Sequence, residues 1–125
     1  MFKKTIFITV AISVTLLSGC APNIKTETLD YGEKPKDYMA IIENFEKLSA
    51  RDPDAIMIKE NIGLRQMYTY GLFSPVKSGW GICYEVNGKN AYGGYVGFKY
   101  KFALIHNGKI IDVKYDNQAV KICLN

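Results

Sequence analysis

The 125-residue sequence has little of what catalytic and metal sites are usually built from. It contains one histidine, His106, one tryptophan and three cysteines, so no pair of histidines stands at metal-ligand spacing. It also lacks the Gly-Lys-Ser/Thr signature of a phosphate loop and the glycine spacing of a dinucleotide site. The sequence therefore predicts no metal and no cofactor, and we expect a protein that is not an enzyme.

The sequence also has only a small excess of positive charge and no long hydrophobic run. The formal net charge is +4, and the apolar run from Thr5 to Leu17 has thirteen residues. As a helix, that run would span about 20 Å, against about 30 Å for the hydrocarbon core of a bilayer. Because Lys3 and Lys4 precede it and small residues follow it, the pattern predicts a signal peptide over residues 1–19 rather than a transmembrane anchor.

The end of this run, Leu17-Ser18-Gly19-Cys20, resembles the lipobox of bacterial lipoproteins. The resemblance implies that the Cys20 thiol receives a diacylglyceryl group, that the chain is cleaved before Cys20, and that the new amine is acylated with a palmitate-like chain. Ala21 rather than an aspartate follows, which by the same resemblance directs the protein to the outer membrane, facing the periplasm. The membrane is thus an expected partner through the lipid on Cys20.

The mature chain would be nearly neutral and would contain one domain. Loss of Lys3 and Lys4 lowers the formal net charge to +2, and without a basic cluster we expect no nucleic-acid binding. Residues 20–34 are mostly polar or small, which predicts a lipidated cysteine followed by a flexible tether. Residues 35–125 then form a single domain.

The first element of that domain is predicted to be an amphipathic helix. Its apolar residues, spaced by three and four, run from Tyr38 through Ile42 to Leu48. Polar residues such as Glu46 fall on the opposite, solvent-facing side. Pro35 suits the first turn and Asp52-Pro53 ends the helix. We expect the apolar stripe to pack on the protein's own sheet, although a partner-binding helix would show the same pattern.

The rest of the domain is predicted to be an antiparallel sheet of about four to five strands. Alternating apolar residues mark strands at residues 80–86 and 98–104, and weaker runs lie at 55–60 and 64–73. Asn107-Gly108 predicts a tight hairpin before a strand at 109–115, and a last strand is expected at 118–124. The fold class is therefore α+β, with one helix layer on one sheet layer.

Cys83 and Cys123 are the two cysteines that lipidation leaves over. In an oxidising compartment an even pair predicts a disulfide, and strand parity places both on one side of the sheet. A reactive thiol or metal pair is the alternative, but no histidine or acidic cluster flanks either residue.

The segment between the two clear strands is rich in glycine and tyrosine. Lys89, Asn90, Tyr92 and Tyr95 form a candidate binding loop there, although glycines that only allow the chain to turn would give the same composition. The run C-x-E-V-N-x-K-N-x-x-G-G-Y-x-G from Cys83 to Gly97 resembles a recurrent group of small bacterial lipoproteins and secreted domains of unassigned activity. The resemblance implies a fold and a location, and no catalytic residue.

These observations predict a non-enzymatic binding or structural module in the periplasm, with an envelope protein or polymer as its partner. A first alternative is an inhibitor of a cell-wall-degrading enzyme, with the Lys89-Asn90 tip entering the enzyme's cleft. A second is a small hydrolase that uses Glu85 or His106 as a general base. For His106, beside the predicted hairpin, a role in flanking the turn is the expected one.

Overall fold

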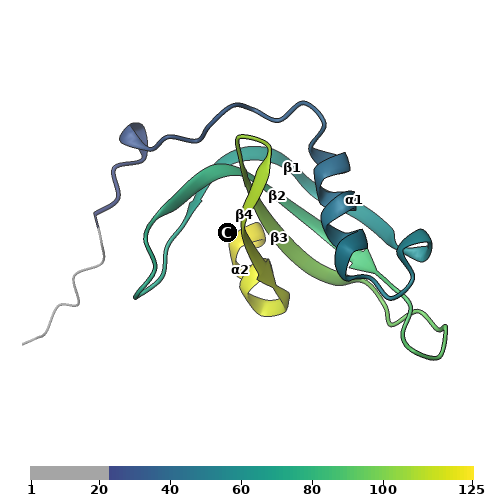
Figure 1. Ribbon diagram of the computed structural model, residues 1–125. Coiled ribbons are helices and arrows are strands. Elements are labelled where there is room, and N and C mark those ends of the chain that lie inside the picture. The colour runs from purple at the N-terminus through teal and green to yellow at the C-terminus, as the bar shows by residue number, and fades with distance from the viewer. Residues whose placement is uncertain (1–22) are drawn as a thin grey trace, which may run out of the picture.

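The computed structural model describes residues 23–125 and confirms an α+β fold (Figure 1). Four strands form one antiparallel sheet in the order β1-β2-β3-β4. They are β1 (Met57–Thr69), β2 (Lys77–Asn87), β3 (Lys99–His106) and β4 (Lys109–Tyr115). The predicted signal peptide and Cys20 lie outside the described residues. Within residues 23–125, neither helix is long and apolar enough to cross a membrane.

Helix α1 (Tyr38–Ser49) covers one face of the sheet, as the sequence predicts. Ile42 is fully buried against Ile82 and Tyr84 of β2 and Ala103 and Ile105 of β3. The predicted division of this helix into buried and solvent-facing sides is wrong at two positions. Glu46 is buried, whereas Leu48 of the expected apolar stripe is exposed. The cause is tertiary, because Glu46 finds two polar partners on the sheet beneath it.

Helix α2 (Asp116–Leu124) replaces the last predicted strand and covers the opposite face. Its buried residues, Ala119 and Cys123, lie four apart and pack on Phe102 and Leu104 of β3. A short apolar run with both periodicities does not distinguish strand from helix, so the assignment at 118–124 was wrong. The domain accordingly has three layers rather than two, with a helix on each face.

The disulfide between Cys83 and Cys123 is confirmed, with the two Cα atoms 6.0 Å apart. The argument from strand parity does not hold, since Cys123 comes from α2. The disulfide joins β2 to α2, the helix that covers the second face of the sheet. It lies in a hydrophobic cluster with Phe102, Leu104 and Ala119.

One hairpin turn and one irregularity in strand pairing set the remaining geometry of the sheet. Asn107 and Gly108 both have positive φ, at 47° and 78°, which confirms the predicted hairpin between β3 and β4. The two weak runs at 55–60 and 64–73 overlap one strand, β1, which ends at Thr69, so the predicted strand at residues 70–73 is wrong and that segment is a loop. The pairing of β1 with β2 shifts register between Glu60 and Arg65. Such a bulge interrupts the alternation of side chains, which explains why the sequence showed two segments.

Candidate functional site

The β2–β3 loop (residues 88–98) is a small hairpin extension with internal hydrogen bonds. The Val96 amide donates to the Gly88 carbonyl at 3.1 Å, and the Asn90 amide donates to the Gly94 carbonyl at 2.8 Å. Lys89 and Tyr95 form an antiparallel bridge between these two bonds. At its base, the Gly97 amide donates to Asn87 Oδ1 at 3.0 Å. The backbone of the loop is therefore held in one conformation rather than left open.

Asn90 organises the tip of the loop. Its Oδ1 accepts hydrogen bonds from the amides of Tyr92, at 2.9 Å, and Gly94, at 3.1 Å. Gly93 supplies the positive φ, 78°, that this turn needs. The side-chain oxygen of Asn90 is thus occupied within the loop, which gives Asn90 a structural role.

Lys89 and Tyr95 fasten the loop to the segment that follows α1. The Tyr95 hydroxyl donates to the Ala55 carbonyl at 2.9 Å. Lys89 Nζ lies 3.9 Å from Asp52 Oδ2 and 5.5 Å from the centroid of the Tyr95 ring. Three of the four candidate residues, Lys89, Asn90 and Tyr95, therefore stabilise the conformation of the loop. Tyr92, which is 96% exposed, is the one whose side chain projects into solvent.

A pocket of about 310 Å³ lies at the base of this loop, and four of its lining residues are cations. Arg51 follows α1, Lys89 belongs to the loop, and Lys99 and Lys101 come from β3. Glu46 is the one acidic residue of the lining. We call this site the basic pocket. Because its cations come from three separate segments, no local pattern in the sequence signals it.

Glu46 and Lys101 of the pocket lining belong to a buried polar network. The Tyr84 hydroxyl donates to Glu46 Oε1 at 2.6 Å, and Lys101 Nζ donates to Glu46 Oε2 at 2.7 Å. Burial, together with the hydrogen bond and the negative charge of Glu46, raises the pKa of the Tyr84 phenol above its usual value of about 10. Because Lys101 neutralises Glu46 and Lys89 faces Asp52, the excess of positive charge in the pocket comes from Arg51 and Lys99.

A larger groove, of about 580 Å³, lies between the segment before α1 and the β3–β4 turn. Its lining carries both signs of charge, with Glu33 and Asp37 beside Lys34 and Lys36. It includes none of the candidate binding residues that the sequence named. We therefore place the candidate site at the β2–β3 loop, which carries an exposed aromatic side chain, and the adjoining basic pocket.

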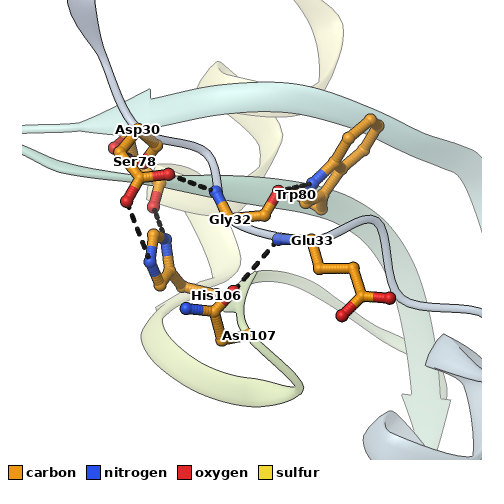
Figure 2. Close-up of polar contacts among 7 residues, drawn as sticks. All are labelled: Asp30, Gly32, Glu33, Ser78, Trp80, His106 and Asn107. Carbon is orange, nitrogen blue, oxygen red and sulfur yellow. Dashed lines mark hydrogen bonds and ion pairs between the residues drawn. The ribbon is translucent and has the colours of Figure 1, made fainter.

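The residues considered for hydrolysis do not meet as a nucleophile and a base. Glu85 lies 3.9 Å from Lys59 across the β1–β2 ladder. Figure 2 shows His106 beside Ser78 and Asp30, where the Nδ1 of His106 donates to the Ser78 carbonyl at 2.9 Å. The Ser78 hydroxyl instead donates to the Asp30 carbonyl. A Ser-His dyad needs the ring nitrogen on the hydroxyl, and here the ring contacts the backbone oxygen.

These contacts attach the segment before α1 to the sheet. Trp80 Nε1 donates to the Gly32 carbonyl at 3.1 Å, and the Glu33 amide donates to Asn107 Oδ1 at 3.0 Å (Figure 2). The sequence predicts a flexible tether up to residue 34. The folded domain instead extends upstream of Pro35, because Asp30, Gly32 and Glu33 are bonded to it.

Among residues 23–125, no three or more His, Cys, Asp or Glu side chains cluster as a metal site would require. Comparison of the chain with protein-family models, curated proteins and solved structures finds no match.

Proposed function

We propose that this protein is a lipid-anchored, non-enzymatic binding module on the periplasmic face of the outer membrane. Its ligand is an envelope protein or polymer that carries anionic groups, and the β2–β3 loop with the basic pocket is the surface that binds it. The lipobox-like residues ending at Cys20 support the anchor and the location.

The observation that carries this proposal is Tyr92, exposed on a loop whose backbone is already fixed. Aromatic side chains contribute strongly to binding because they bury a large area with few rotatable bonds. A loop that is ordered before binding loses less conformational entropy when the ligand arrives. Asn90, Lys89 and Tyr95 supply that order through the contacts described above.

The basic pocket supports the chemical class of the ligand. Arg51, Lys89 and Lys99 line it together with the neutralised Glu46–Lys101 pair. Complementary charge raises the rate of association and disfavours partners of the wrong sign. Carboxylate or phosphate groups, carried by an envelope polymer or by an acidic protein surface, match this lining.

The test uses the lipid-free mature chain from Ala21, immobilised and exposed to envelope extract and to purified cell-wall sacculi. We expect stoichiometric capture that Tyr92→Ala abolishes and that an Arg51→Ala/Lys99→Ala variant weakens. Leu124→Ala is the control, since Leu124 is also an exposed large apolar side chain, at 68%, and lies on α2, away from the β2–β3 loop. Both single variants should change the free energy of unfolding by less than about 0.5 kcal/mol. Capture that is unaffected by Tyr92→Ala would contradict the proposal.

Inhibition of a wall-degrading enzyme remains a second candidate, because the β2–β3 loop projects from the end of the domain (Figure 1). In this version Tyr92, rather than the Lys89-Asn90 pair named from the sequence, enters the enzyme's cleft. A purified muramidase assayed on sacculi should then be slowed by the wild-type chain and not by Tyr92→Ala. Hydrolysis of wall fragments by this chain alone would instead favour the hydrolase alternative.

A further inference from the structure

The β1–β2 loop (residues 70–76) exposes apolar side chains at its tip. Leu72 is 90% exposed and Phe73 is 96% exposed, and Tyr70 and Val76 beside them are also exposed. Adjacent exposed leucine and phenylalanine side chains at the end of a hairpin are unfavourable in water, since each leaves a large apolar surface hydrated. A contiguous apolar protrusion of this kind marks a surface that contacts another apolar phase.

The tip stands on a paired and ordered base. β1 and β2 remain paired up to Thr69 and Lys77, and the Ser74 amide donates to the Gly71 carbonyl at 3.4 Å. The rings of Tyr68 and Tyr70 stack with their centroids 6.2 Å apart. The exposure of Leu72 and Phe73 is therefore a property of a defined hairpin turn.

This loop and the β2–β3 loop lie at opposite ends of the same ladder. Met57 pairs with Asn87 next to the β2–β3 loop, and Thr69 pairs with Lys77 next to the β1–β2 loop. At about 3.3 Å per residue, the thirteen residues of β1 give a path of about 40 Å between the two ends. Figure 1 shows the two loops at opposite sides of the domain.

The first described residues lie at the same end as the β1–β2 loop. Thr26 and Tyr68 line one groove of about 450 Å³, and Tyr68 is two residues from Tyr70. Cys20 precedes Thr26 by six residues, which span at most about 20 Å of chain. A lipid on Cys20 would therefore place a bilayer within reach of this end of the domain.

We propose that Leu72 and Phe73 insert into the interfacial region of the phospholipid bilayer to which the chain is tethered. The proposal rests on the proposed lipidation of Cys20 for its geometry. A convex pair of side chains needs no complementary pocket in a fluid lipid surface, whereas a protein partner would have to supply one. Lys114 near the loop is paired with Asp112, and the neighbouring Lys77 favours anionic headgroups at the same surface. Insertion orients the domain, so that the β2–β3 loop faces away from the membrane.

The experiment couples the mature chain, starting at Cys20, to a maleimide-bearing phospholipid in phosphatidylethanolamine/phosphatidylglycerol vesicles. Cys83 and Cys123 are joined in a disulfide, so Cys20 carries the free thiol. Phe73→Trp and the matched Tyr92→Trp report depth through quenching by bromine-labelled lipid chains, after subtraction of the Trp80 signal measured in the wild type. Both positions are 96% exposed, so either substitution should leave the fold intact, as circular dichroism verifies.

We expect quenching of Trp at position 73 to exceed that at position 92 by about threefold or more, since only an inserted side chain approaches the acyl chains. Leu72→Ser added to Phe73→Trp should reduce the quenching. Equal quenching at both positions would overturn the proposal, and so would a blue-shifted emission at position 73 without quenching, which indicates a protein contact. Because the tether is chemical, these outcomes are independent of whether cells lipidate Cys20, which mass spectrometry of the envelope protein decides separately.

Discussion

Lys101 offers the sharpest test of how the buried polar network stabilises the domain. Lys101 Nζ lies 2.7 Å from Glu46 Oε2, and the two side chains are 17% and 4% exposed. Replacement of Lys101 by Met keeps the length of the side chain but leaves a buried carboxylate with Tyr84 as its remaining bonded partner. Removing one partner of a buried pair costs about 3 to 5 kcal/mol. Because Lys101 retains some solvent contact, we expect Lys101→Met to fall at the lower end, at about 3 kcal/mol.

An exposed ion pair in helix α1 provides a control for the expected loss of stability in Lys101→Met. Lys47 and Glu43 form an ion pair at 2.6 Å in which both side chains are more than a third exposed, and exposed pairs contribute less than about 1 kcal/mol. Lys47→Met should therefore change stability little. The double variant Glu46→Gln/Lys101→Met should recover much of the loss caused by Lys101→Met, since it removes the unpaired buried charge and keeps an oxygen that accepts from the Tyr84 hydroxyl.

The assay is equilibrium unfolding in guanidinium chloride at pH 7, followed by circular dichroism. The free energies of unfolding of the variants are compared provided that their m-values, the slopes against denaturant concentration, are equal. The reasoning is refuted if Lys101→Met destabilises by less than about 1 kcal/mol, the range of an exposed pair. It is also refuted if the double variant is less stable than Lys101→Met, because the buried carboxylate would then not be the source of the loss.

Three further predictions concern the disulfide, the lipidation of Cys20 and the pH dependence of stability. Cys123→Ser should lower stability by about 4 kcal/mol on the chain-entropy model for a loop of forty residues, and two free thiols titrated in the denatured mature domain without reductant, apart from Cys20, would refute the bond. Cys20→Ser should yield an unlipidated and uncleaved precursor, since a hydroxyl does not form the thioether, and mass spectrometry finding an unmodified Cys20 in the wild-type envelope would contradict the anchor. The raised pKa of Tyr84 means that folding favours the neutral phenol, so wild-type stability should be intact below about pH 10 and fall above it, with a smaller decrease in Tyr84→Phe on alkaline titration.

The candidate site was recognised from sequence only in part. Asn90, Gly93 and the surrounding turn-forming residues marked a structured loop correctly, because turn formation depends on neighbouring residues. The roles within that loop depended on contacts from elsewhere in the chain, such as those of Tyr95 with Ala55 and of Lys89 with Asp52. The exposed tip at Leu72 and Phe73 was missed, since an apolar run next to a strand reads as more strand when only local pattern is considered.

The sequence by itself determined the features that depend on short spacing. The helix around Ile42, the two alternating strands, the Asn107-Gly108 hairpin and the pairing of the last two cysteines all follow from local periodicity, turn chemistry or residue count, and the structure confirms them. Tertiary structure decided where long-range partners outweighed local pattern. Cys123 lies on a helix because Ala119 and Cys123 together cover the second face of β3. Glu46 is buried because Tyr84 and Lys101 satisfy both of its oxygens, and such compensation becomes visible only when the chain is folded.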